Sequence, residues 1–158
     1  MRQILRQHEL LVDDWRYPEE AGGGPQALGF AALVAELGAA GAALPAGSGV
    51  VVGPTDDVRL LAPCIASLAL VVVHFEKNGD GRGFSQAQVL RQQLGYRGEL
   101  RAAGAIKRDH LYLLARCGFD AFDLDPAEDA REALAQLGRF SVAYQQASGT
   151  LVQPRLRS

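Results

Sequence analysis

The run from residue 69 to residue 75, Ala-Leu-Val-Val-Val-His-Phe, constrains the fold more than any other part of the chain. It contains three consecutive valines and, apart from its histidine, no side chain that could carry a charge. A continuous apolar run of this kind is typical of a strand that is buried on both faces, as in a parallel sheet that helices cover. Because parallel strands need long crossover connections, the run predicts an α/β fold.

Segments with strand and helix patterns alternate along most of the chain. We expect strands at 49–53, 69–75, 99–103, 121–124 and 140–144. We expect helices at 26–37, 56–62, 85–94, 107–117 and 126–137. This order predicts a single α/β domain over residues 1–146, built of repeated βα units with a mainly parallel sheet. The sheet could be open with three layers or resemble half of a β/α barrel. Residues 1–25 are expected to be irregular, and residues 147–158 to form a flexible tail.

The ends of the expected helices carry their own signals. Residues 85–88 and 125–128 have the pattern of capping boxes, in which a side chain accepts hydrogen bonds from the free N–H groups of a helix start. Gly95, Gly118 and Gly138 each follow an expected helix, where a left-handed residue is favoured. These signals support the positions of the helices.

The charge balance limits the classes of partner. The chain has 158 residues, of which 16 are basic and 18 acidic, so its formal net charge is -2. This balance argues against a general nucleic-acid binder. The apolar run at 68–73 is too short to span a bilayer, and the charged first residues do not fit a secretory signal. We therefore expect a cytoplasmic protein that binds neither nucleic acid nor membrane.

Cysteine content and glycine spacing bear on cofactors. Cys64 and Cys117 form no Cys-x-x-Cys motif, and two thiolates are too few for an iron–sulfur cluster or a cysteine-rich zinc site. A disulfide between them is left open. The dinucleotide signature Gly-x-Gly-x-x-Gly fails because Phe84 occupies the third glycine position, and no phosphate-binding Gly-Lys-Ser/Thr loop exists. We therefore expect no metal and no evident cofactor, since the motifs support neither a flavin nor a nicotinamide nucleotide.

The charges are unevenly distributed. Residues 77–117 carry a net charge of +5, and the rest of the chain carries -7. The basic segment begins with the glycine-rich stretch 76–83, which follows the strand expected at 69–75. In parallel α/β sheets, ligands bind beyond the carboxyl ends of the strands. Backbone N–H groups of glycines, a helix start and an arginine fork all suit an anion. We therefore predict a site for an anionic ligand or partner at this stretch.

Candidate residues can be named for this site. The candidate anion-binding residues are Gly81, Arg82, Gly83, Ser85, Gln86, Arg101 and Arg108. Asp80 and Asp109 are the candidate acid/base residues if the site is catalytic. Two alternatives stay open: the stretch could be a turn that only connects strand and helix, and Arg101 could pair with Glu99 or Asp109 instead of a ligand.

Several long and unusual stretches carry a family resemblance. They lie at residues 80–87 (Asp-Gly-Arg-Gly-Phe-Ser-Gln-Ala), 90–91, 94–102, 116–122 and 140–145. They resemble a bacterial family, domain-of-unknown-function family 934, and the family-like core spans residues 69–146. Members of that family are described as oxidoreductases involved in sulfite reduction. The sequence departs from the family pattern at three places: residues 75–79 (Phe-Glu-Lys-Asn-Gly) stand where the family has a Phe-Pro-Lys-Phe-Thr-like run, Ala105 replaces an acidic residue, and His110 replaces a glutamine.

The resemblance implies an accessory protein of assimilatory sulfite reduction that binds an anionic ligand or partner at residues 79–85. One alternative is a non-catalytic docking module for sulfite reductase or its electron donor. The other is an enzyme that acts on a small phosphorylated metabolite. Whether the protein is an enzyme at all, and whether it forms a homo-oligomer, are left open at this stage.

Overall fold

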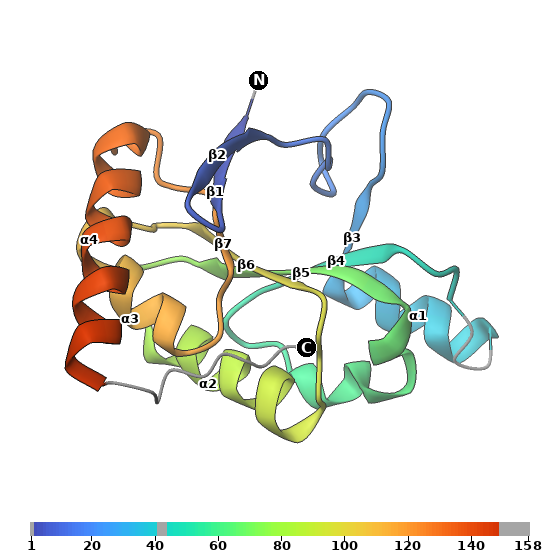
Figure 1. Cartoon of the computed structure of the whole chain (residues 1–158). Helices are drawn as coiled ribbons and strands as arrows, with labels where there is room; N and C mark the ends of the chain where they lie inside the picture. The colour runs from blue at the N-terminus through green and yellow to red at the C-terminus, as the bar shows by residue number, and fades with distance from the viewer. Residues whose placement is uncertain (1, 41–43, 149–158) are drawn as a thin grey trace.

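A computed structural model describes residues 2–40 and 44–148 as an α/β domain around one seven-stranded sheet (Figure 1). The strands are β1 Gln3–Arg6, β2 Glu9–Val12, β3 Ala27–Gly29, β4 Ser48–Val52, β5 Leu68–Phe75, β6 Glu99–Gly104 and β7 Ala121–Phe122. The α-helices are α1 Phe30–Ala40, α2 Gly81–Gln88, α3 Leu111–Arg116 and α4 Ala130–Ser148. Two 3-10 helices, η1 Val58–Ser67 and η3 Arg108–His110, and the π-helix η2 Val89–Gln93 complete the elements.

The sheet is open and mostly parallel, with the strand order β2-β1-β7-β6-β5-β4-β3. Strands β3 to β7 are parallel neighbours in chain order. Right-handed connections between successive neighbours all fall on one face of a sheet. Figure 1 accordingly shows α1, α2 and α3 on the same side of it. The expected α/β fold with a mainly parallel sheet is confirmed, but a third layer of helices is absent from the described residues.

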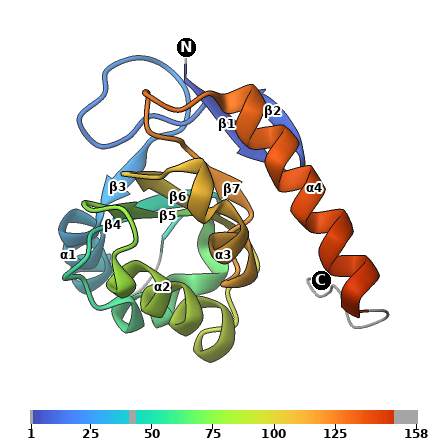
Figure 2. The same cartoon turned by 90° about the vertical axis from the view of Figure 1, so that its left-hand side faces the viewer.

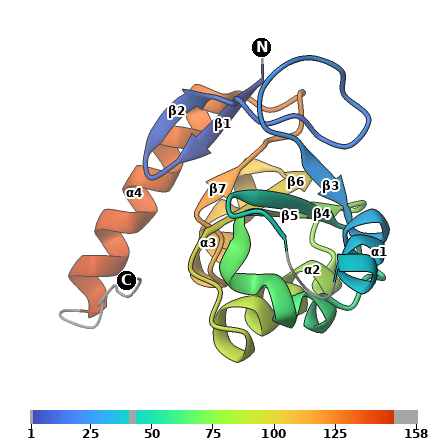
Figure 3. The same ribbon diagram turned by 90° about the vertical axis from the view of Figure 1, so that its right-hand side faces the viewer.

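The second face of the sheet is covered by irregular chain instead of helices. The segment between β2 and β3 arches over this face (Figure 3). There Trp15 and Tyr17 pack on Leu70 and Val72 of β5, whereas Val71, Val73 and Phe75 face the main core. The strand expected at 69–75 is therefore buried on both faces over most of its length, and the prediction from its apolar run is confirmed.

The chain start departs from the expectation. Instead of an irregular segment, residues 3–12 form an antiparallel hairpin, β1–β2, in which Leu5 is fully buried. Strand β1 also pairs with β7, opposite Phe122. An isolated two-stranded hairpin is marginally stable in water. The pairing with β7, far along the chain, therefore stabilises β1 and β2, and no local signal reveals it.

The end of the domain is helical where the sequence predicts a strand. Helix α4 includes residues 140–144 and Gly138, so the strand and the helix end expected there are wrong. It starts at Ala130, because the Asp129 carboxylate accepts hydrogen bonds from the N–H groups of Arg131 (3.0 Å) and Glu132 (3.2 Å). The helix packs on α3 and β2, along the hairpin (Figure 2). Of the expected tail, residues 147–148 belong to α4 and residues 149–158 lie outside the described residues.

Several other boundaries also differ from the prediction. The capping box expected at 125–128 is wrong, because α4 begins only at Ala130, and the strand expected at 121–124 ends at Phe122. The helix expected at 107–117 is divided into η3 and α3. The helix expected at 26–37 is preceded by the short strand β3, so it begins at Phe30. The helix expected at 56–62 is the 3-10 helix η1, which continues through Pro63 to Ser67. Within the described ranges, no helix combines the length and the apolar character needed to cross a membrane.

Candidate functional site

The carboxyl ends of β5 and β6 form the edge at which the sequence predicts a site. Phe75, which ends β5, lies opposite Gly104, which ends β6, and the N–H of Ala105 donates to the Phe75 carbonyl at 2.8 Å. Gly104 has a φ of 92°, and a Cβ there would lie 2.4 Å from the Phe75 oxygen and 2.8 Å from the His74 ring. Only glycine fits this turn. The loops after β5 and β6 therefore leave the sheet side by side, with His74 packed over Gly104.

Asp80 organises the start of α2. One carboxylate oxygen accepts from the N–H of Arg82 at 3.0 Å, and the guanidinium folds back to bind the same carboxylate through Nε (3.1 Å) and Nη2 (2.8 Å). The helix therefore begins at Gly81, and the capping box expected at Ser85 is wrong: the Ser85 hydroxyl lies inside the helix and donates to the Gly81 carbonyl. The carboxylate of Asp80 thus takes the place at the helix start that the sequence assigns to a ligand.

Arg82 also determines the protonation state of the Asp80 carboxyl group. Hydrogen bonds from the Arg82 side chain and backbone lower the pKa of the Asp80 carboxyl to about 2. A group with such a pKa stays ionised at neutral pH and has no proton to give. Asp80 is therefore poorly suited to general acid/base chemistry, the role that the sequence reserves for it.

A similar arrangement occurs at the start of η1. There the Asp57 carboxylate accepts from the N–H of Arg59 at 3.0 Å and lies 3.6 Å from its guanidinium. The Asp129 carboxylate likewise accepts from the N–H of Arg131 at the start of α4, so three Asp-x-Arg sequences that follow a parallel strand start a helix. The pair at Asp80 and Arg82 is thus in part a device that starts a helix. The Asp80 side chain is nevertheless only 10% exposed, whereas that of Asp57 is 56% exposed.

The two glycines of the predicted site have different surroundings. A Cβ at Gly83 would lie 2.4 Å from the Phe75 ring, so this glycine lets α2 pack closely on β5. A Cβ at Gly81 would meet open space. Gly83 therefore serves the contact between helix and strand, and its position does not require a ligand.

Gln86 holds α2 to the loop that follows β4. Its side chain is almost fully buried, and Nε2 donates to the carbonyl oxygens of Gly53 (2.8 Å) and Asp56 (3.0 Å). These two bonds set the orientation of the amide. The other amide atom, Oε1, has no hydrogen-bond partner among the described residues. Gln86 thus joins α2 to the loop after β4 instead of facing the loop before α2.

Arg101 lies on the sheet face that is opposite the helices. Its side chain is 1% exposed and forms ion pairs with Asp13 (2.8 Å) and Glu99 (2.8 Å). The same Asp13 carboxylate accepts from Arg2 at 2.7 Å. The pairing with Glu99 that the sequence leaves open is present, whereas Asp109 is not among its partners and Arg82 does not share its site. We assign Arg101 to the buried polar network that holds residues 13–17 on the sheet.

The remaining candidates lie in and beyond the loop after β6. Arg108 pairs with Glu132 of α4, and its backbone N–H donates to Glu128 at 2.9 Å. Asp109 is exposed at the surface. His110 lies over the loop before α2, with Nε2 3.8 Å from where a Cβ of Gly79 would be. This histidine, which departs from the family pattern, is thus close to the predicted site.

The cysteines show no sign of activation. Both are free, so they are not joined by the disulfide that the sequence leaves open. Burial raises the pKa of the Cys64 thiol and that of the Cys117 thiol. Because the thiolate is the reactive form, neither environment favours nucleophilic or redox chemistry at neutral pH.

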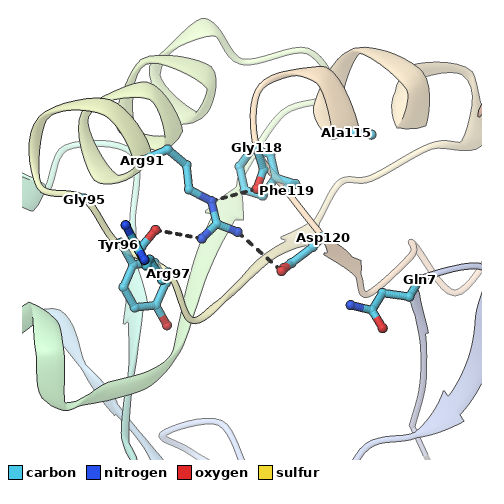
Figure 4. A pocket seen from close by; sticks show the side chains of 9 residues that line it. All are labelled: Gln7, Arg91, Gly95, Tyr96, Arg97, Ala115, Gly118, Phe119 and Asp120. Carbon is cyan, nitrogen blue, oxygen red and sulfur yellow. Dashed lines mark hydrogen bonds and ion pairs between the residues drawn. The ribbon is translucent and has the colours of Figure 1, made fainter. Parts of the chain in front are cut away.

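A second hollow lies at the opposite, amino edge of the sheet (Figure 4). It has a volume of about 690 Å³. It is lined by Gln7, Arg91, Gly95, Tyr96, Arg97, Ala115, Gly118, Phe119 and Asp120. No sequence pattern predicts it, because its lining comes from the β1–β2 turn, from η2 and α3 and from the loops that follow these two helices, and only the tertiary structure brings them together. Among the sequence features described above, only the basic segment 77–117 includes residues that line this hollow.

Comparison with known proteins gives one family. No curated protein and no solved structure matches the chain. The family model described as "Bacterial protein of unknown function (DUF934)" matches residues 49–154, which is more than half of the chain. That range includes the loop before α2, the carboxyl ends of β4 to β7 and most of the lining of the second hollow. The chain therefore belongs to the bacterial family of unknown function DUF934.

Proposed function

We propose that this protein is an accessory protein of assimilatory sulfite reduction, and that it binds an anionic group at the carboxyl edge of the sheet between β5 and β6. The orientation of Arg82 is the observation that carries the proposal. Asp80 holds one edge of the guanidinium, through Nε and Nη2. Three of its five N–H groups have no partner in the part of the chain that the structure describes, and the side chain is 52% exposed.

Such an arginine is preorganised for binding. A guanidinium that a carboxylate already orients loses little side-chain entropy when it meets a second anion. Two further cations lie in the adjacent loops, because Lys77 follows β5, Lys107 follows β6, and both are exposed. The pair of Asp80 and Arg82 is neutral as a unit, and the exposed Glu76 and Asp109 in the same loops offset the charges of the two lysines. The main contribution of this edge to binding is therefore the directed hydrogen bonds of Arg82.

The geometry favours binding over catalysis. Asp80 stays ionised beside Arg82, so it has no proton to give at neutral pH, and Asp109 lies exposed at the surface outside any cleft that the structure shows at this edge. This weighs against an enzyme that acts on a small phosphorylated metabolite. The link to sulfite reduction rests on the family resemblance. The anionic group would be an acidic surface of sulfite reductase or of its electron donor, or a small oxyanion.

Two assays separate the sources of the anion. The first measures the melting temperature of the purified protein with sulfite, sulfate or phosphate. A ligand that binds only the folded state at 100 times its Kd stabilises it by about 2.7 kcal/mol. The second measures co-purification with sulfite reductase at low and at high salt. A salt-sensitive complex without a melting shift supports docking, because salt screens exposed charges.

Two matched arginine variants test whether the anionic group binds at Arg82. Arg82→Ala should weaken the interaction about tenfold, because it removes a charge-assisted hydrogen-bond donor. Arg59→Ala removes an exposed arginine with the same local pairing at another helix start and should leave binding unchanged. The proposal is wrong if no oxyanion and no sulfur-assimilation protein binds, or if the two variants behave alike.

A further inference from the structure

The hollow at the amino edge of the sheet is independent of the site proposed above. Its lining loops, residues 95–98 and 118–120, lead into β6 and β7, whereas the loops of the proposed anion site leave β5 and β6. Its volume of about 690 Å³ lies within the range of roughly 300–1,000 Å³ that small-molecule sites occupy. Sulfite or sulfate alone would leave most of it empty.

Arg91 lines this hollow, and most of its N–H groups already have a hydrogen-bond acceptor. Its Nε donates to the Gly118 carbonyl at 3.0 Å, and its Nη1 donates to the carbonyls of Tyr96 and Gly98 at 2.9 Å each (Figure 4). Its Nη2 lies 3.4 Å from Asp120. Since Arg91 has five N–H groups, one N–H on Nη2 remains for an acceptor. The arginine is therefore rigid and offers one directed donor.

Asp120 provides the complementary group. One of its oxygens accepts from the N–H of Leu100 at 2.8 Å, and among the described residues the other makes only the long 3.4 Å contact with Arg91. Charge-assisted N–H···O bonds are usually about 2.7–2.9 Å, so this second oxygen has capacity for a stronger donor. Burial raises the pKa of the Asp120 carboxyl in spite of Arg91, as expected for a carboxylate that is short of compensating charge. Its side chain is still 41% exposed, so a ligand can reach it.

The β1–β2 turn brings a third polar group to the hollow. Gln7 and His8 form a two-residue turn, and both are left-handed, with φ values of 49° and 70°. Such turns favour Asn-Gly, because a side chain is strained at positive φ. Gln7 lines the hollow, and in the view of Figure 4 the Asp120 carboxylate lies between the Gln7 amide and Arg91. A role of the Gln7 side chain in the hollow would explain why this position holds glutamine, although glycine would adopt the same backbone conformation without strain.

We infer that this hollow binds a zwitterionic ligand, an α-amino acid or a short peptide. The ammonium group would bind the second oxygen of Asp120, and the carboxylate would accept the remaining N–H of Arg91. The Gln7 amide would bind a polar group of the same ligand. Arg91 and Asp120 present one positive and one negative group side by side, so a ligand that carries both an ammonium and a carboxylate group complements them better than an amine or an acid alone.

Nuclear magnetic resonance titration of the full chain tests this inference. The probes are L-serine, L-glutamate and triglycine. Shifts of the backbone amide signals of Gln7, Gly118 and Asp120 should saturate with at least one of them. N-acetyl-L-serine lacks the ammonium group and L-serinamide lacks the carboxylate, so neither should cause those shifts. The inference is overturned if no zwitterion shifts these signals, or if the two blocked compounds act equally well.

Substitutions at the lining residues provide a second test of the inference. Asp120→Asn keeps the acceptor for the Leu100 N–H but removes the charge, and it should weaken binding more than tenfold. Gln7→Gly should weaken binding about fivefold while raising the melting temperature, since strain in the turn is relieved. His8→Gly relieves the same kind of strain but does not line the hollow, so it should raise the melting temperature and leave binding unchanged. Equal affinities in Gln7→Gly and His8→Gly would contradict the inference even if Asp120→Asn failed to fold.

Discussion

Replacement of Arg101 by methionine should be among the most destabilising single changes in the protein. Its side chain is 1% exposed, and its guanidinium binds Asp13 at 2.8 Å and Glu99 at 2.8 Å. Methionine fills a similar volume but leaves both carboxylates without this partner. Removal of one member of a buried ion pair costs about 3–5 kcal/mol of folding free energy.

The neighbouring arginines place the cost at the lower end of that range. Asp13 keeps its ion pair with Arg2 at 2.7 Å, and Glu99 keeps that with Arg6 at 3.0 Å. We therefore expect a loss of about 3 kcal/mol. For a domain of this size, that loss lowers the melting temperature by about 6–12 °C.

Urea unfolding followed by tryptophan fluorescence measures the effect. Trp15 is the single tryptophan, and it packs on the sheet face that contains Arg101, so its emission reports on this region. Arg59→Met is the control, because the Arg59 side chain is 59% exposed; its cost should stay within about 0.5 kcal/mol. In the double variant Arg101→Met with Asp13→Asn, the cost should be about 1–2 kcal/mol below the sum of the single costs.

A small effect would refute the reasoning. If Arg101→Met loses less than about 1 kcal/mol, or if the two substitutions are additive, the buried ion pairs do not hold residues 13–17 on the sheet.

Three further predictions concern α2 and α4. Gly83→Ala should cost about 1–3 kcal/mol, because its Cβ would overlap the ring that ends β5, whereas Gly81→Ala should be close to neutral; thermal unfolding of the two variants compares them. The Asp80 carboxyl should titrate with a pKa of about 2, so its stabilising effect is present above its ordinary pKa near 4 and is lost as the pH falls through about 2. Carbon-detected magnetic resonance should show a higher pKa in Arg82→Ala, but one that stays below the ordinary value, because the backbone N–H of residue 82 still donates to the carboxylate. Asp129→Ala should cost about 1 kcal/mol in urea unfolding, since it removes the cap of α4; no loss would mean that the helix starts elsewhere.

Much of the central fold could be predicted from local patterns. The strands at 49–53, 69–75 and 99–103 correspond to β4, β5 and β6. In the first two, the apolar runs encode burial directly. Gly95 and Gly118 have positive φ values and follow η2 and α3, as expected. The hairpin at residues 3–12 could not be predicted, because its stability depends on pairing with β7.

The candidate site shows the limit of the same reasoning. The sequence correctly places the loop before α2 beyond the carboxyl end of the most buried strand. It leaves open which charges neutralise one another, and Asp80 and Arg82 do so two residues apart. That contact is local, yet it depends on the exact start of α2, which the capping pattern at Ser85 misplaces.

The sequence by itself determined the α/β class, the buried central strand and the family, because periodicity, glycine positions and long motifs are local properties of the chain. The tertiary structure alone decided that the helices cover one face, that Arg101 pairs with Asp13 across 88 positions, and that Gln7, Arg91 and Asp120 line one hollow. The physical reason is that the pairing of buried charges and the shape of a cavity depend on which distant segments become neighbours. The order of the strands in the sheet and the packing of the whole core determine which segments become neighbours.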